Sequence, residues 1–162
     1  MSSVSGLSRE HRIKARDLAV EAAVLTIANA PLIHYTQGPL RWQGIDEELK
    51  AWRGQFPRYA DCSAMGTWWL WQGLDHFGCR DTVNGTGFRS GFTGTMLTHG
   101  KRVQHQANWL RGDLLIYGDG YPGEHVAMYL GGGFVASHGS ERGPFRLRWD
   151  YRPDLYQVRR YI

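Results

Sequence analysis

Cysteine is scarce in this chain, and only Cys62 and Cys79 occur among its 162 residues. Two cysteines supply neither a disulfide framework nor a four-ligand zinc site, so we expect two free thiols. Long apolar runs are also missing, since no stretch approaches the roughly 18 residues that a membrane-spanning helix needs. Residues 1–17 lack the apolar segment of a secretory signal. We therefore expect synthesis in a cytoplasm without a signal peptide, and no insertion into a membrane.

Runs of one charge are absent as well. The net charge is +4 and the pI is about 9.3, which suits an anionic partner such as a bacterial cell wall, a membrane surface or a nucleic acid. The basic residues are scattered and form no cluster of the kind that marks a nucleic-acid-binding arm. We therefore do not expect nucleic acid to be the main partner.

The order of predicted elements indicates one α+β domain over residues 1–162, with 1–8 as a flexible N-terminus. Apolar periodicity predicts helices first, and short apolar runs between Gly, Pro and Asp predict strands later. Helices are expected at residues 8–29, 46–52, 62–73 and 93–99, and strands at 113–118, 124–130, 133–138, 145–149 and 156–162. This order favours N-terminal helices packed on a C-terminal antiparallel sheet.

Cys62 directly follows Asp61, a good helix N-cap, and opens a segment that is apolar almost all round. A thiol becomes a strong nucleophile as a thiolate, and a helix N-terminus and a nearby imidazolium both lower its pKa. The free N–H groups at a helix start can also stabilise an oxyanion. Cys62 is therefore a candidate nucleophile. The alternative is a small buried apolar residue, which free cysteines often are.

A predicted hairpin supplies a candidate base. If Gly131 and Gly132 form a two-residue turn, Ala127 opposes Ala136 and His125 opposes His138, on one face of the ribbon. In that register His125 takes the Cys62 proton and His138 orients His125 through its other ring nitrogen. Two readings stay open: a polar pair near a sheet edge, or a three-residue turn that includes Gly133 and shifts the register.

A metal or phosphate site is the other reading of these residues. The histidines available are His99, His105, His125 and His138, but none lies in a known zinc-binding spacing. The glycine-rich segment 85–94 lacks the Lys-Ser/Thr ending of a phosphate loop and is read as a surface loop. We expect no metal and no cofactor.

Several motifs together resemble a known family. The segments DCSAM, GDLLIYG, HVAMYLGGG and ASHG resemble the NlpC-type peptidoglycan peptidases, which have a papain-like fold. HYTQGPLRWQG, RYADCS and SHGSERGPF are similar to peptidase domains of endolysins from phages of actinobacteria, and the likeness runs from about residue 10 to the end. The resemblance implies Cys62 as nucleophile, His125 as base and His138 as the third polar residue. It also implies a place for Tyr35 near the substrate and oxyanion.

The resemblance further implies hydrolysis of the peptidoglycan stem peptide, between the γ-carboxyl of D-glutamate and meso-diaminopimelate. It implies a phage endolysin that passes a holin pore to lyse the host, and we expect a monomer. We assign Ser63 and Trp42 to oxyanion or substrate binding as further candidates. Two alternatives remain: an N-acetylmuramoyl-L-alanine amidase with the same triad, and a non-catalytic wall-binding module.

Overall fold

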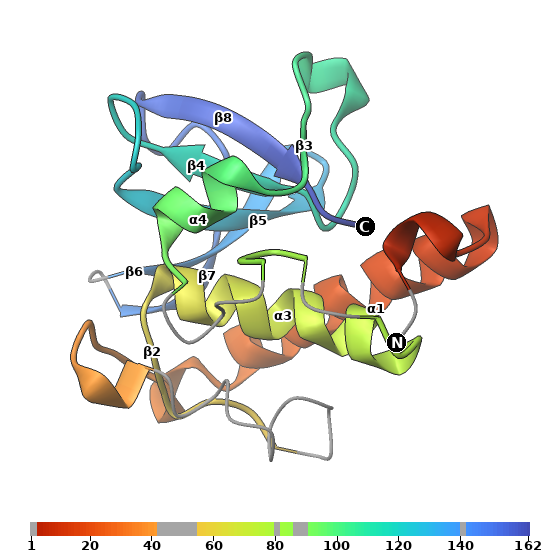
Figure 1. The fold of residues 1–162 in the computed structure, drawn as a ribbon. Helices are drawn as coiled ribbons and strands as arrows, with labels where there is room; N and C mark the ends of the chain where they lie inside the picture. Colours follow the sequence, from red (N-terminus) through yellow and green to blue (C-terminus); the bar gives the residue numbers. More distant parts are fainter. Residues whose placement is uncertain (1–2, 42–54, 80–81, 86–90, 140–141) are drawn as a thin grey trace.

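The computed structural model describes residues 3–41, 55–79, 82–85, 91–139 and 142–162. A twisted antiparallel sheet forms one layer, and helices α1 and α3 cover one of its faces (Figure 1). The helices are α1 Arg9–Ala28, α3 Cys62–His76 and α4 Thr93–Thr98, with 3₁₀ turns at Val4–Gly6, Ala30–Leu32 and Gln106–Asn108. The strands are β1 His34–Tyr35, β2 Tyr59–Ala60, β3 Lys101–Arg102, β4 Leu114–Tyr117, β5 His125–Gly131, β6 Phe134–Gly139, β7 Arg142–Arg148 and β8 Leu155–Arg160. The expected α+β architecture is confirmed.

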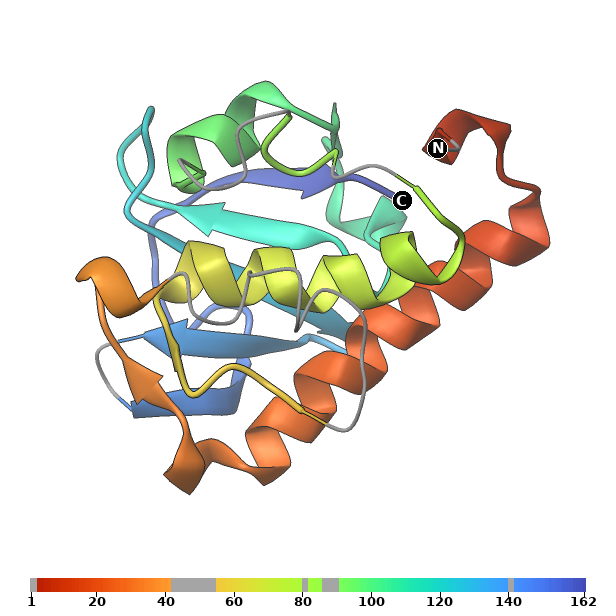
Figure 2. The same cartoon turned by 60° about the horizontal axis from the view of Figure 1, so that its bottom comes forward.

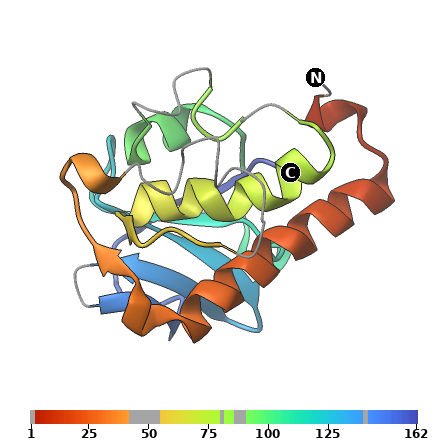
Figure 3. The same cartoon turned by 90° about the horizontal axis from the view of Figure 1, so that it is seen from below.

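Helix α1 begins where its sequence predicts. The Ser8 side chain caps it by accepting a hydrogen bond from the His11 N–H at 3.1 Å. The helix ends at Ala28, shortly before Pro31, which lacks the N–H that a continuing helix needs. Its small buried residues, including Ala15, let it pack closely against α3. Figures 2 and 3 show the two helices in contact on one side of the sheet. Ahead of it, partly buried side chains in the first few described residues pack on the core.

Helix α3 is buried along most of its length, as its apolar sequence predicts. It runs three residues past Gly73, which sequence analysis took as its end. Gly73 lies against the backbone of α1, where an added Cβ would collide with the Ala15 carbonyl. This glycine therefore permits close packing of two helices instead of ending one. A buried bond of 3.0 Å from Trp69 Nε1 to Thr26 Oγ1 joins the same two helices.

The sheet has the strand order β3-β8-β4-β5-β6-β7, with every described pair antiparallel. The five longer strands match the five predicted from sequence, and sequence analysis missed the two-residue strands β1, β2 and β3. Strands β1 and β2 pair in parallel, with Tyr35 beside Ala60, and bring the β1 segment to the start of α3. The predicted helix at 46–52 and Trp42 lie outside the described residues.

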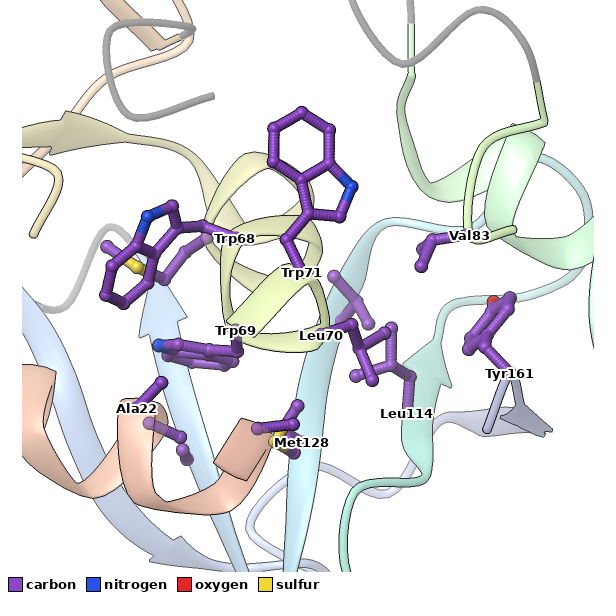
Figure 4. Close-up of a cluster of buried hydrophobic side chains, with 14 of the residues drawn as sticks. Ala22, Trp68, Trp69, Leu70, Trp71, Val83, Leu114, Met128 and Tyr161 are labelled. Atoms are coloured by element: carbon purple, nitrogen blue, oxygen red, sulfur yellow. The ribbon is translucent and has the colours of Figure 1, made fainter. Parts of the chain in front are cut away.

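Apolar side chains fill both faces of the sheet. The larger core lies between the sheet and the helices, where Trp69 and Leu70 of α3 face Leu114 and Met128 of the sheet (Figure 4). The smaller core lies on the other face, under partly buried aromatic side chains from the loops. Its buried members are Leu115, Tyr117, Ala127, Val135 and Val158. Within the described chain, no helix is long and apolar enough to cross a membrane.

The β5–β6 hairpin has a different register from the predicted one. Gly131, Gly132 and Gly133 all have positive φ, at 93°, 61° and 85°, and the ladder shifts near the turn. Ala127 therefore pairs with Ser137 instead of Ala136. Because side chains alternate between faces, this shift of one residue moves His138 to the face opposite His125. The predicted pairing of the two histidines is wrong.

Candidate active site

Cys62 is the first residue of α3, and its side chain is buried with 6% of its surface exposed. Asp61 caps the helix by accepting the Ala64 N–H at 2.8 Å, as predicted. The thiol interacts with the backbone of Val126, the residue after His125 in β5, and with that of Ser63. The structure thus brings the candidate nucleophile to the start of the strand that carries the candidate base. Cys79 is also buried, and both cysteines are free thiols.

Burial dominates the electrostatics of this thiol. Burial is the largest cause and the Asp61 carboxylate adds to it, so that the pKa of Cys62 is raised to about 12. Backbone hydrogen bonds from Val126 and Ser63 lower that pKa, and so does the charge of Arg41, but they do not offset burial. The net effect is opposite to the lowering that we expected at a helix N-terminus. A nucleophilic role for this thiol would therefore require a base that removes its proton.

His125 is the first residue of β5 and is 5% exposed. Its Nε2 lies 2.8 Å from Ser137 Oγ on β6, and that hydroxyl lies 3.1 Å from the Tyr151 hydroxyl. Ser137 thus contacts His125 in the way predicted for His138. Sequence analysis missed Ser137 and Tyr151. Three consecutive glycines at the turn were the available signal, because they permit the longer turn that sets this register.

His138 is fully buried on the face of the sheet that α3 covers. Its Nε2 lies 2.9 Å from the Ala60 carbonyl oxygen, just ahead of the α3 cap. Its ring meets the Tyr35 ring edge-on, with centroids 5.5 Å apart. These contacts tie β6 to β1 and β2, and none of them orients the His125 ring.

Tyr35 and His125 line the same cleft, which has a volume of about 690 Å³. The Tyr35 hydroxyl accepts a hydrogen bond of 3.1 Å from Gln37 Nε2. The other lining residues are Gln37, Glu124, Gly139, Leu147, Tyr151 and Arg152. On the cleft wall, Arg152 bonds both Glu124, at 3.1 Å, and Asp154, at 2.6 Å. Arg152 and Glu124 therefore place paired charges on the wall of the cleft.

The remaining candidate residues from the sequence make contacts away from His125. Ser63 is buried in the first turn of α3, where its hydroxyl donates to Asp61 Oδ1 at 3.0 Å and accepts from Arg41. Its side chain therefore serves the cap network, and it does not line the cleft. His99 bonds the Thr95 carbonyl oxygen at 2.8 Å. Within the described ranges, no group of three His, Cys, Asp or Glu side chains is arranged to hold a metal ion.

Comparisons with known protein families and with curated proteins find no match. Solved structures do match in fold. The peptidoglycan hydrolase RipB from Mycobacterium tuberculosis has a TM-score of 0.65 at 20% identity, covering 98% of this chain and 70% of that chain. NlpC1 from Trichomonas vaginalis has a TM-score of 0.60 at 17% identity, covering 91% of this chain and 44% of that one. NlpC2 from the same organism has a TM-score of 0.59 at 14% identity, covering 99% and 50%.

These likenesses confirm the NlpC-type fold that the sequence motifs implied. At such identities they concern the fold alone. The chain spans about half the length of the two Trichomonas proteins.

Proposed function

We propose that this chain is a cysteine peptidase that hydrolyses peptide bonds in bacterial peptidoglycan, with Cys62 as nucleophile and His125 as base. One observation carries the proposal: the Cys62 thiol lies at the first residue of α3, against the backbone of Val126, the residue that follows His125 in β5. The fold shared with RipB, a peptidoglycan hydrolase, supports the choice of substrate. No cofactor is required by this chemistry.

The first half of the reaction forms a thioester. As the Cys62 sulfur attacks the scissile carbonyl carbon, its proton passes to Nδ1 of His125, because Ser137 engages Nε2. The carbon–nitrogen bond then breaks, and His125 returns the proton to the leaving amine. In the second half, His125 takes a proton from water as the water attacks the thioester carbon. The carbon–sulfur bond breaks, the acid is released, and the proton on His125 passes to the sulfur to restore the thiol.

The orienting role falls to Ser137 in this proposal. A hydrogen bond from Nε2–H to Ser137 Oγ fixes the tautomer in which Nδ1 of His125 can accept a proton. The Tyr151 hydroxyl, 3.1 Å from Ser137 Oγ, holds the serine in place. His138 remains a candidate from sequence, but its contact with the Ala60 carbonyl suits a structural role.

The oxyanion would lie at the start of α3. The first N–H groups of a helix have no partner within the helix, and the Cys62 N–H is one of these. Preorganised donors of this kind stabilise the negative charge that develops on the carbonyl oxygen. The Tyr35 hydroxyl, on the wall of the same cleft as His125, is the second candidate donor.

The sequence motifs indicate a more specific substrate and source. We propose cleavage between the γ-carboxyl of D-glutamate and meso-diaminopimelate, by an endolysin of a phage that infects actinobacteria. The scattered positive charge, +4 overall, suits an anionic wall. Monomeric state, release through a holin pore and the absence of a nucleic-acid partner belong to the same proposal.

Digestion of purified diaminopimelate-containing wall tests the proposal. Mass spectrometry of the soluble fragments should find a new amine on diaminopimelate, and Cys62→Ala should release nothing while keeping the wild-type fold. Cys79→Ala is the matched control and should digest normally, since Cys79 follows the C-terminal end of α3, the end of the helix opposite Cys62. A new amine on L-alanine would instead identify an amidase. Tight wall binding without released fragments would identify a binding module.

A further inference from the structure

Arg41 connects three parts of the chain at the start of α3. Its Nε lies 2.7 Å from Asp61 Oδ2, and its Nη2 donates to Ser63 Oγ at 2.7 Å and to the Gly91 carbonyl at 3.1 Å. The Arg41 side chain is 15% exposed and that of Asp61 10%. Pairs with so little solvent are screened weakly by salt. This contact therefore differs from an ordinary surface ion pair.

The Arg41–Asp61 ion pair balances two opposing effects of the Asp61 carboxylate at the helix cap. A carboxylate is an effective N-cap, and Asp61 accepts hydrogen bonds from the Ala64 N–H and the Ser63 hydroxyl. The same negative charge opposes formation of a thiolate on the next residue, Cys62. A cation bound to the carboxylate keeps the cap and reduces this repulsion. Arg41 is the cation in that position.

We propose that Arg41 is a positioning residue for the nucleophile: it neutralises the Asp61 carboxylate next to Cys62 and fixes the first turn of α3 to the segment that follows β1. A planar guanidinium suits this role, because its rigid set of N–H donors can bind the Asp61 carboxylate and the Ser63 hydroxyl at the same time. The catalytic meaning of the inference rests on the proposed function. The effect on thiol reactivity does not.

The strands near the start of α3 carry other titratable groups. These are His125 on β5, His138 on β6 and Tyr35 on β1, and none of them is among the largest causes of the shift in the pKa of Cys62. Asp61 and Arg41 are the charged groups that act on the Cys62 thiol. The charge of Arg41 also acts directly on the thiol, but Asp61 holds the guanidinium in place. The effect of a change at Arg41 should therefore be smaller once the Asp61 charge is removed.

The test measures alkylation of Cys62 by iodoacetamide as a function of pH, in a Cys79→Ala background. Arg41→Met should slow alkylation about tenfold at neutral pH, because each unit of pKa changes the thiolate fraction tenfold. Arg41→Lys keeps the charge and should slow it less. Asp61→Asn keeps a good cap and should speed it up. In Asp61→Asn protein, the further change Arg41→Met should slow alkylation by less than it does when Asp61 is present.

Arg111→Met is the matched control, since Arg111 forms an exposed pair with Asp17 at 3.7 Å. Its alkylation profile should equal that of the wild type. The inference is overturned if Arg41→Met alkylates like the wild type at all pH values. It is also overturned if Arg41→Met slows the reaction equally with and without the Asp61 charge. Because alkylation requires no peptidase activity, these results are independent of any failure of the variants, or of the wild type, to digest wall.

Discussion

The imidazole of His125 and the hydroxyl of Ser137 are 2.8 Å apart, on neighbouring strands of the sheet. A neutral hydroxyl can orient an imidazole, but it stabilises an imidazolium less than a carboxylate would. A permanent thiolate–imidazolium pair is therefore disfavoured here, and burial of Cys62 acts in the same direction. In the proposed mechanism, the Cys62 proton should therefore move during the attack on substrate.

Replacement of Ser137 tests the orienting role. Ser137→Ala removes the hydrogen-bond partner of His125 Nε2, and we expect kcat for wall digestion to fall about tenfold. A complete general base contributes roughly 100-fold or more, and the loss of an orienting group should cost only part of that. Ser137→Thr keeps the hydroxyl and should retain more activity. The melting temperature of each variant, measured alongside, separates lost catalysis from lost folding.

His138→Gln provides the comparison for that experiment. His138 bonds the Ala60 carbonyl and is fully buried, so this change should lower stability more than kcat. If His138→Gln instead abolished turnover while Ser137→Ala digested wall normally, the assignment of Ser137 would be wrong and His138 would be the orienting residue.

The raised pKa of Cys62 predicts a dependence of stability on alkaline pH. The pKa is about 12 in the folded protein against an ordinary value of 9.0, so the folded state retains the thiol proton over this interval. The contribution of the protonated Cys62 thiol to the free energy of unfolding is complete below about pH 9 and is lost as pH rises toward about 12. Cys62→Ser does not titrate there, so urea midpoints should fall less steeply with pH for this variant. Equal slopes would show that Cys62 ionises normally.

Sequence patterns predicted most of the elements, but not how they meet at the site. The Ser8 and Asp61 caps and the five long strands are local features, and the structure has them where they were expected. The Ser137 contact with His125 depends on one extra residue in a turn, which Gly133 supplies. The alternation of apolar and polar residues does not reveal a one-residue shift of register, yet such a shift moves each side chain of β6 to the opposite face of the sheet relative to β5.

The end of α3 illustrates the same limit. A glycine near the end of a helical pattern is read as an exit signal from sequence alone. Gly73 is instead required by contact with Ala15, which is distant in the chain. Such tertiary reasons for a glycine cannot be recognised until the partner helix is placed.

Two glycines of α3 should respond oppositely to substitution by alanine. Gly66→Ala should stabilise the protein by about 0.5–1 kcal/mol, because its added Cβ meets only ordinary contacts at 3.8 Å with Leu114 and Met96. Gly73→Ala should destabilise it by about 1–3 kcal/mol, because the Cβ collides with the Ala15 backbone. Chemical denaturation measures both values. A stable Gly73→Ala protein would disprove the close helix contact.

Asp113 should be required for stability and not for chemistry. It is fully buried, accepts the Leu110 N–H at 2.8 Å, and forms a two-pronged contact with Arg160 at 2.8 and 2.7 Å. Asp113→Asn should cost about 2 kcal/mol, less than a fully buried pair because Arg160 is partly exposed. Asp17→Asn, in an exposed pair, should cost less than about 1 kcal/mol. Denaturation midpoints that rank these variants the other way would contradict this reading.

The three tryptophans of α3 have a practical consequence. Trp68, Trp69 and Trp71 are 0%, 1% and 2% exposed, and all lie on the helix that begins with Cys62 (Figure 4). Indole emission shifts to longer wavelength when water reaches the ring. Three of the seven tryptophans of the chain lie on this helix, so part of any change in intrinsic fluorescence will report its detachment from its surroundings without any added label.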